Sequence, residues 1–173
     1  MTTLVLTIVG DDRHGLVAAV ADAVDAHGGN WENSQLAELA GVFAGIVEVA
    51  VPDDRVDELR AALRGMDGLL NITAHPSSAA AAREREASAR HFGFRVLGND
   101  RPGIVREVSS TLSAQGVSID RLTTETRDAA MSGGRLFEAT IAARVPPTVD
   151  IDAVQAALER LATEIQVDVT VGD

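Results

Sequence analysis

The pattern of apolar residues at the start of the chain predicts a strand, a turn and a helix. Residues 3–9 alternate between two faces that are both apolar, which is typical of a strand in the middle of a sheet. A turn of Gly10, Asp11 and Asp12 follows, and Asp12 is the predicted N-cap of a helix that ends near Gly28. This helix carries apolar residues at helical spacing, namely Leu16, Val17, Val20 and Val24.

The pattern continues through two extended segments, a second helix and a last strand. Residues 30–39 are predicted to be extended, residues 40–41 to form a turn, and residues 42–51 to form an apolar strand. A second helix begins after Pro52 and a short strand over residues 69–74 follows it. The apolar positions of that helix are Val56, Leu59, Leu63 and Met66. The order β-α-β-β-α-β is that of the ferredoxin-like split unit.

The same pattern restarts in the second half of the chain. Adding 88 to a residue number gives its partner, so Gly10 matches Gly98 and Gly28 matches Gly116. The connection 128–134 is longer than its counterpart, and after it the offset becomes 94. Repetition of this length and order predicts a duplicated domain rather than a solenoid. The second half is predicted to contain strands over residues 117–127, 135–145 and 165–171 and a last helix with Ile151, Val154, Leu158 and Leu161.

We therefore predict an α+β protein with two tandem ferredoxin-like domains. Each is expected to hold a four-stranded antiparallel sheet with two helices on one face, over residues 1–76 and 91–173. Residues 77–90 are dominated by alanine and charged side chains, which indicates a solvated linker with helix propensity. Open sheet faces and edge strands favour side-by-side pairing within the chain or between chains, so a homo-oligomer such as a homodimer is expected.

Composition narrows the classes of partner and compartment. The chain has 173 residues, 46% of them hydrophobic, and Lys+Arg 15 against Asp+Glu 26 gives a net charge of -11. An acidic chain gains little from nucleic-acid phosphates or anionic membranes, so neither is an expected partner. Cysteine is absent, which excludes disulfides and thiol chemistry. The N-terminus has no signal-peptide pattern and no apolar run could span a bilayer, so a cytoplasmic location is expected.

No catalytic or metal-binding pattern stands out in the sequence. Nucleophile elbows, phosphate loops and dinucleotide fingerprints are missing, so we expect no enzyme activity and no cofactor. The single tryptophan, Trp31, aligns with Ile119 and is predicted to serve a core or an interface. The four histidines lack ligand spacing, which argues against a metal site: His14, His27, His75 and His91.

The candidate site is a turn that occurs twice, over residues 10–17 and 98–105. A glycine turn that leads from a strand into a helix exposes backbone N–H groups, and these groups and the helix dipole favour a carboxylate. The nearby carboxylate and amide side chains are suited to an ammonium group, so a zwitterion fits both ends. Gly103→Val is expected to abolish ligand binding and to leave the fold intact. The candidate ligand-binding residues are Asp11, Asp12, Arg13, His14, Gly15, Leu16, Asn99, Asp100, Arg101, Pro102, Gly103 and Ile104.

Asp-Arg-Pro-Gly-Ile-Val between the first strand and helix of a β-α-β-β-α-β unit resembles the ACT domain. The second copy, residues 100–105, fits this motif, whereas the first copy has His14 where proline is typical. Two such units in tandem resemble the glycine cleavage system transcriptional repressor family, as does the stretch from Gly29 to Gly45. The resemblance implies a non-catalytic regulatory protein that binds a small amino acid, glycine or serine favoured, at contacts between ACT units. It also implies a protein partner, such as a transcriptional activator or an enzyme.

Three alternatives stay open at the level of sequence. Asp-x-x-Gly at a strand–helix junction is also ordinary turn and capping chemistry, so the turns need not bind a ligand. The chain is then a protein-interaction module. Alternatively, it is the regulatory subunit of an enzyme of amino-acid metabolism.

Overall fold

The computed structural model describes residues 1–77, 89–129, 134–165 and 167–172. The chain divides into two compact units, Met1–Ala82 and Arg83–Asp173. Most of the predicted linker and the middle of the connection 128–134 lie outside the described residues, so those two predictions stay untested.

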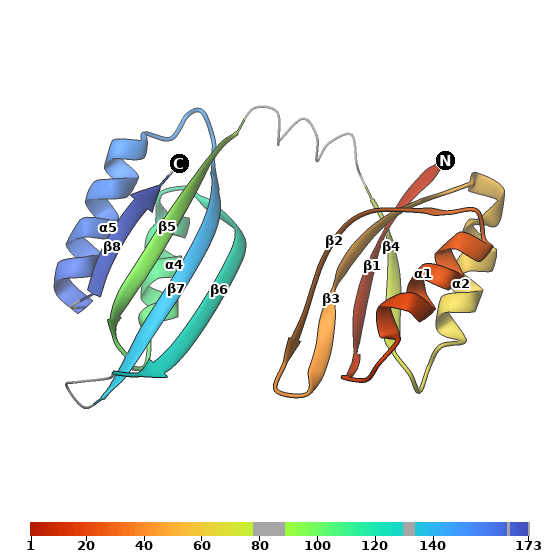
Figure 1. Ribbon diagram of the computed structural model, residues 1–173. Helices are drawn as coiled ribbons and strands as arrows, with labels where there is room; N and C mark the ends of the chain where they lie inside the picture. Colours follow the sequence, from red (N-terminus) through yellow and green to blue (C-terminus); the bar gives the residue numbers. More distant parts are fainter. Residues whose placement is uncertain (78–88, 130–133, 166, 173) are drawn as a thin grey trace. The chain divides into compact units, whose positions relative to one another are not determined.

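The first unit has the predicted split order (Figure 1). Its strands pair in the order β2-β3-β1-β4, with every pair antiparallel, and both helices lie on one face of the sheet. The elements are β1 Thr2–Asp11, α1 Leu16–Ala26, β2 Asn30–Leu39, β3 Val42–Val51, a 3₁₀ turn Asp53–Arg55, α2 Val56–Arg64 and β4 Asn71–Pro76. The last strand begins two residues later than the sequence pattern indicated, because Leu69 and Leu70 still belong to the turn that ends the helix.

The second unit repeats this topology with the sheet order β6-β7-β5-β8. Its elements are β5 Arg90–Asn99, α4 Ile104–Ala114, β6 Ser118–Asp128, β7 Arg135–Val145, α5 Ile151–Ile165 and β8 Val167–Gly172. The predicted α+β fold of two ferredoxin-like domains is confirmed. Among the described residues, none of the helices combines the length and apolar character that crossing a membrane requires.

Strand register confirms both sequence offsets. Gly10 pairs with Phe43 in the first sheet, and Gly98 pairs with Phe137 in the second. Irregularities also fall at matching places, after Trp31 in β2 and after Ile119 in β6. Both of these side chains are partly buried against the core of their own unit, which agrees with a core role for the tryptophan.

Each unit has its own core between sheet and helices. In the first unit Leu4 and Leu6 of β1 are fully buried, together with Val20 and Val24 of α1. Val17 is 46% exposed and does not join them, contrary to the predicted apolar stripe. At about 100° per residue Val17 points within about 20° of the buried Val24, so its exposure does not come from helical phase. Its counterpart Val105 in the first turn of α4 is exposed as well, at 41%.

Both first helices end in the same glycine turn. The N–H of Gly29 donates to the carbonyl of Val24 at 2.9 Å, and Gly28, with φ of 66°, occupies the left-handed position. The N–H of Gly28 donates to the carbonyl of Asp25 at 2.8 Å, and the second unit has the equivalent two bonds, from Gly116 to Ser113 and from Val117 to Leu112, both at 3.0 Å. This arrangement is the Schellman motif, which the glycine pattern predicted.

One ion pair ties the chain start to the beginning of the second helix of the first unit. The Thr2 hydroxyl donates to Asp53 Oδ1 at 2.7 Å, and the terminal amine donates to Asp53 Oδ2 at 3.1 Å. The hydrogen bond from Thr2, followed by the terminal amine, holds the pKa of Asp53 below its ordinary value of 3.8. This contact therefore stabilises the unit above that pH, and the stabilisation is lost as the pH falls through the lowered pKa.

Thr2→Val is expected to raise the pKa of Asp53 toward 3.8, because the largest cause of the shift is removed. An NMR titration of the Asp53 side-chain carboxyl measures this directly. An unchanged titration midpoint in Thr2→Val contradicts the assignment of the hydroxyl as the main cause.

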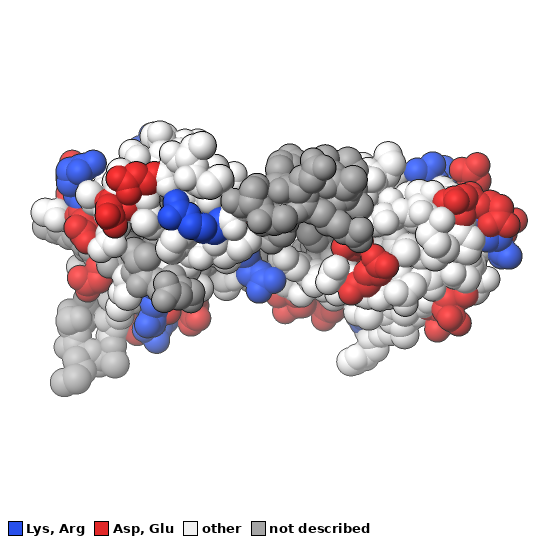
Figure 2. Space-filling model, turned by 90° about the horizontal axis from the view of Figure 1, so that it is seen from above, with Lys and Arg blue, Asp and Glu red and all other residues white. Residues whose placement is uncertain are grey.

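Acidic and basic side chains share the surface. On the face seen in Figure 2, the basic groups of the described residues stand apart from one another beside acidic ones. Separate basic groups offer a phosphate backbone little continuous positive surface.

Candidate functional site

The two glycine turns each follow the first strand of their unit. Asp12, Arg13 and His14 are exposed in the first turn. The N–H of Asp12 donates to the carbonyl of Gly41 at 2.9 Å, and the N–H of Asp100 donates to that of Arg135 at 2.8 Å. Each turn is thus held by the start of the neighbouring strand, which places both turns at equivalent positions.

A glycine in the left-handed conformation precedes each helix. Gly15 has φ of 87° and Gly103 has φ of 96°, and each is the residue at the N-cap. The prediction that Asp12 caps the first helix is therefore wrong, because the chain continues for three more residues before it turns. Gly103→Val remains a prediction, and the φ of Gly103 adds that this variant is destabilised as well as changed at the turn. A β-branched side chain in this region is strained by at least about 1–2 kcal/mol.

The backbone N–H groups at the start of α1 and of α4 donate no capping bond to a side chain in the described part of the chain, so they remain available as donors. No side chain of the described residues caps α1 or α4. The first backbone bonds within these helices run from Ala19 to Gly15 and from Glu107 to Gly103. The N–H groups of the residues between them point along the helix axis toward the turn, where the dipole favours an anion.

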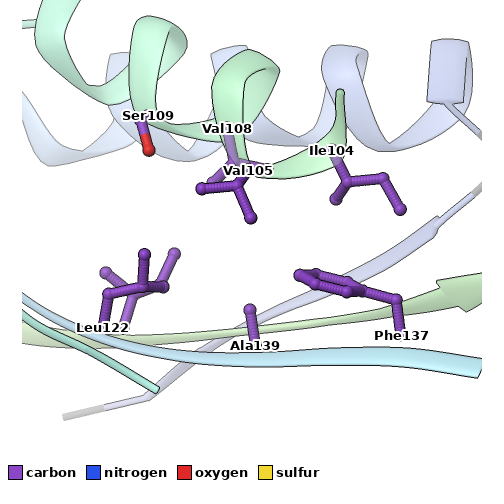
Figure 3. Close-up of a pocket in the computed structure, with 8 residues that line it drawn as sticks. Ile104, Val105, Val108, Ser109, Leu122, Phe137 and Ala139 are labelled. Carbon is purple, nitrogen blue, oxygen red and sulfur yellow. The ribbon is translucent and has the colours of Figure 1, made fainter. Parts of the chain in front are cut away.

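A small apolar recess lies behind the second turn, between α4 and the strands β6 and β7 (Figure 3). Its volume is about 10 Å³, the space of a single water-sized sphere. Val105 and Leu122 line it and remain 41% and 39% exposed. A recess of this size has room for a methyl-sized group, and a larger side chain would have to displace its walls.

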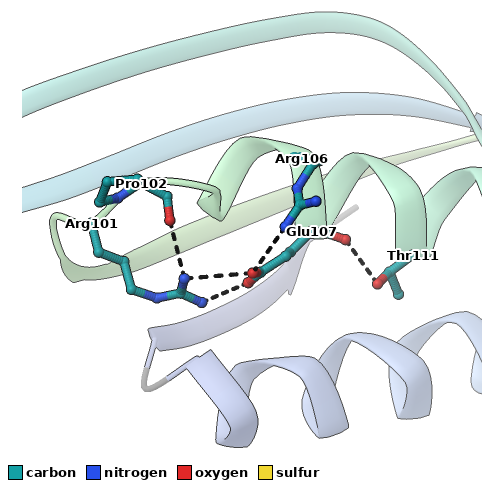
Figure 4. A network of polar contacts seen from close by, with 5 residues as sticks. All are labelled: Arg101, Pro102, Arg106, Glu107 and Thr111. Atoms are coloured by element: carbon teal, nitrogen blue, oxygen red, sulfur yellow. Dashed lines mark hydrogen bonds and ion pairs between the residues drawn. The ribbon is translucent and has the colours of Figure 1, made fainter.

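Arg101 in the second glycine turn forms an ion pair with Glu107 of α4, the helix that follows it (Figure 4). Its Nη2 lies 2.6 Å from Glu107 Oε2, and its Nη1 donates to the Pro102 carbonyl at 3.2 Å. Arg106 lies 3.9 Å from the same carboxylate, and the backbone carbonyl of Glu107 accepts a bond from Thr111 at 2.9 Å. A protein carboxylate thus already stands by this helix start.

The first turn lacks that carboxylate. Ala19 occupies the position equivalent to Glu107, and the first helical turn of α1, over residues 16–19, contains no acidic residue. Arg13 lies 3.8 Å from Asp11 Oδ2, and both side chains are largely exposed, at 49% and 88%. The first turn therefore combines an uncapped helix start with an exposed arginine and exposed carboxylates.

The structure places the twelve predicted site residues in two groups, one in each unit. Leu16 and Ile104 are buried in the two cores, so they contribute backbone N–H groups and not side chains. Sequence reasoning missed Glu107, although an acidic residue in the first turn of a helix is a known partner for the dipole. It also missed the carbonyls of Gly41 and Arg135, which no local pattern marks.

The described residues hold no group of three or more His, Asp or Glu side chains arranged as a metal site needs.

The chain was compared with protein families and with solved structures. Two family models, both described as ACT domain, match residues 2–75 and residues 94–163. No curated protein matches the chain by sequence.

Two solved structures match over almost the whole chain. An unknown protein from Galdieria sulphuraria is 29% identical, with 98% of this chain and 96% of that chain covered and a TM-score of 0.83. A candidate glycine cleavage system transcriptional repressor is 18% identical, with 99% and 96% covered and a TM-score of 0.71. The tandem arrangement of both units is thus found in other proteins.

Proposed function

The chain belongs to the ACT-domain family, and from that premise we propose that it is a non-catalytic regulatory protein that senses a small amino acid. The ligand binds at the turn between β1 and α1, with the residues Asp11–Leu16. The observation that carries this proposal is the uncapped start of α1 beside an exposed arginine.

The carboxylate of the ligand is held by the helix start. Its oxygens accept from the first N–H groups of α1, and the guanidinium of Arg13 adds a charge-assisted bond. In the second unit Glu107 competes for the equivalent place, since its carboxylate already pairs with Arg101. The first turn is therefore the stronger carboxylate site, although the second turn fits the family motif better.

The ammonium group of the ligand is held by Asp11 and Asp12, whose side chains are exposed beside the turn. Release of Asp11 from its 3.8 Å contact with Arg13 lets each group take one end of a zwitterion. Glycine and serine are favoured, because neither carries a side chain that needs a deep pocket. The single candidate turn of the second unit, with Asn99 and Asp100, offers the same chemistry in weaker form.

Sensing requires a second surface over the exposed turn. The resemblance to the ACT family implies that a further ACT unit supplies it, and a ligand that binds the paired state better shifts the population toward pairing. Paired units then differ in affinity for a protein partner. Fold likeness to a candidate glycine cleavage repressor supports transcriptional control of glycine metabolism as the setting.

Ala18→Glu is expected to weaken binding of glycine or serine at least about tenfold. The new carboxylate lies at the positive end of the α1 dipole, where it competes with the carboxylate of the ligand and repels it. Ala18 is exposed, so the change leaves the core untouched. Isothermal titration calorimetry on the full chain measures the affinity. The matched control is Ala18→Gln, which has the same shape without the charge and should retain binding.

Equal losses in both variants contradict the carboxylate site. No heat and no thermal shift of the unaltered chain with any of the common amino acids favours a ligand-free interaction module instead. Co-purification with an enzyme rather than a transcription factor favours the regulatory-subunit alternative.

A further inference from the structure

The face of the first sheet that is turned away from α1 and α2 carries exposed apolar side chains. Strand alternation sends Leu4, Leu6 and Ile8 toward the helices, so the residues between them point to the opposite face. We call this opposite face the outer face. Four large apolar side chains on it are strongly exposed: Val9 44%, Leu39 80%, Val42 45% and Ile46 47%.

Strand register makes these four residues neighbours. Val42 pairs with Leu39 in β2 and Ile46 lies two outward positions further along β3. Val9 pairs with Ala44, the outward residue between those two, and Ala44 also pairs with Ala37. The apolar side chains therefore form one continuous patch across β2, β3 and β1, and it is not a set of isolated exposed residues.

The outer face of the second sheet keeps apolar residues at two of these four positions, Leu97 and Leu136, but is polar or charged elsewhere. Ala44 corresponds to Glu138, and the exposed Leu39 corresponds to Arg127. Glu138 is bound by Arg95 at 2.7 Å and by Arg127 at 3.3 Å, so ion pairs occupy the middle of this face. The two units share one topology, but the continuous apolar patch of the first outer face is interrupted in the second by Arg127, Glu138 and Thr140. A shared structural need of the fold therefore does not explain the full patch.

We propose that the outer face of the first sheet binds the same face of a second copy of this chain. A two-fold contact of this kind buries the apolar patch against itself, with the two sheets packed face to face. The chain carries a net charge of -11, so two copies repel each other over most of their surface. The apolar patch carries no charge, which makes it the place where two copies approach at least cost.

The size of the face suits a stable dimer. Three of its strands have ten residues each. At about 3.4 Å per residue and about 4.8 Å between strands, the sheet presents a face of about 30 by 20 Å. Its projected area of about 600 Å² per copy, increased by the relief of the side chains, approaches the roughly 800 Å² per partner of standard interfaces.

Ile46→Lys tests this contact, because it places a charge in the centre of the apolar patch. We expect the unaltered chain to dimerise and Ile46→Lys to weaken the dimer at least about 100-fold in sedimentation equilibrium over a concentration series. Thr140→Lys is the matched control, since Thr140 holds the equivalent position on the outer face of the second sheet. It should leave the dimer unchanged, and circular dichroism checks that both variants fold.

A single cysteine locates the contact independently, because the chain has no cysteine of its own. Thr7→Cys lies on the outer face beside Ile46 and should give a symmetric cross-linked dimer with a short thiol-reactive linker. Thr140→Cys should give none. A monomeric chain, a dimer that survives Ile46→Lys, or cross-linking that favours Thr140→Cys each overturns the proposal, and none of these outcomes touches amino-acid binding by the first turn.

Discussion

Phe94→Ala is expected to destabilise the second unit by about 3–5 kcal/mol and to leave the first unit unchanged. Phe94 is 2% exposed in the core of the second unit, so its removal leaves a cavity that the sheet and helices fill incompletely. Denaturant unfolding followed by Trp31 fluorescence reports on the first unit, which contains the single tryptophan. Circular dichroism reports on both units.

The matched control for this experiment is Leu6→Ala. Leu6 occupies the equivalent position in the first unit and is fully buried. It should shift the fluorescence transition, which Phe94→Ala should not shift. A fluorescence transition that moves equally in both variants would show that the two cores unfold as one cooperative body.

Gly45→Ala is expected to destabilise the first unit by about 3 kcal/mol, which is severe for the addition of one methyl group. A Cβ at Gly45 overlaps the backbone carbonyl oxygen of Gln35 and lies 2.8 Å from the Cα of Leu36. Because these are backbone atoms of β2, relief requires the edge strand to move. The loss of stability is measured by denaturant unfolding with Trp31 fluorescence, since Trp31 belongs to the same strand.

The second unit provides the comparison for Gly45. Ala139 occupies the equivalent position, is 3% exposed and already accommodates a Cβ. Ala139→Gly should therefore cost only about 1 kcal/mol, from chain entropy and one lost methyl contact. A loss of only about 1 kcal/mol in Gly45→Ala, similar to that of Ala139→Gly, would mean that the backbone of β2 moves away from the new Cβ at little cost in stability.

The sequence predicted the elements well where burial alone decides them. Residues 42–51 and 135–145 are strands with the predicted ends, because apolar runs bounded by turn residues are pinned by both the core and the hairpin. Gly28 and Gly116 end their helices as predicted, since each must adopt a positive φ that other residues resist.

Predictions failed where neighbouring residues offered equivalent local chemistry. Asp12 and Gly15 are both acceptable at a helix start, and the structure places Gly15 there with φ of 87°, while the Asp12 N–H donates to the carbonyl of Gly41 in the β2–β3 hairpin. The spacing of Val17 to Val20 and Val24 predicts one apolar face, but spacing alone does not say how far the sheet extends along that face. The structure begins α1 at Leu16, so Val17 lies in the first turn of the helix and is 46% exposed, although it points within about 20° of the buried Val24.

By itself the sequence determined the duplication, the split fold of each unit and the residues of the two candidate turns, since all of these follow from periodicity and from glycine positions. Only the tertiary structure decided how the turns differ, with Glu107 on Arg101 in the second unit and Arg13 exposed in the first. It also decided that one outer face carries a continuous apolar patch, which ion pairs interrupt on the other. The physical reason is that alternation marks which residues share a strand face, whereas register between strands decides which of them meet.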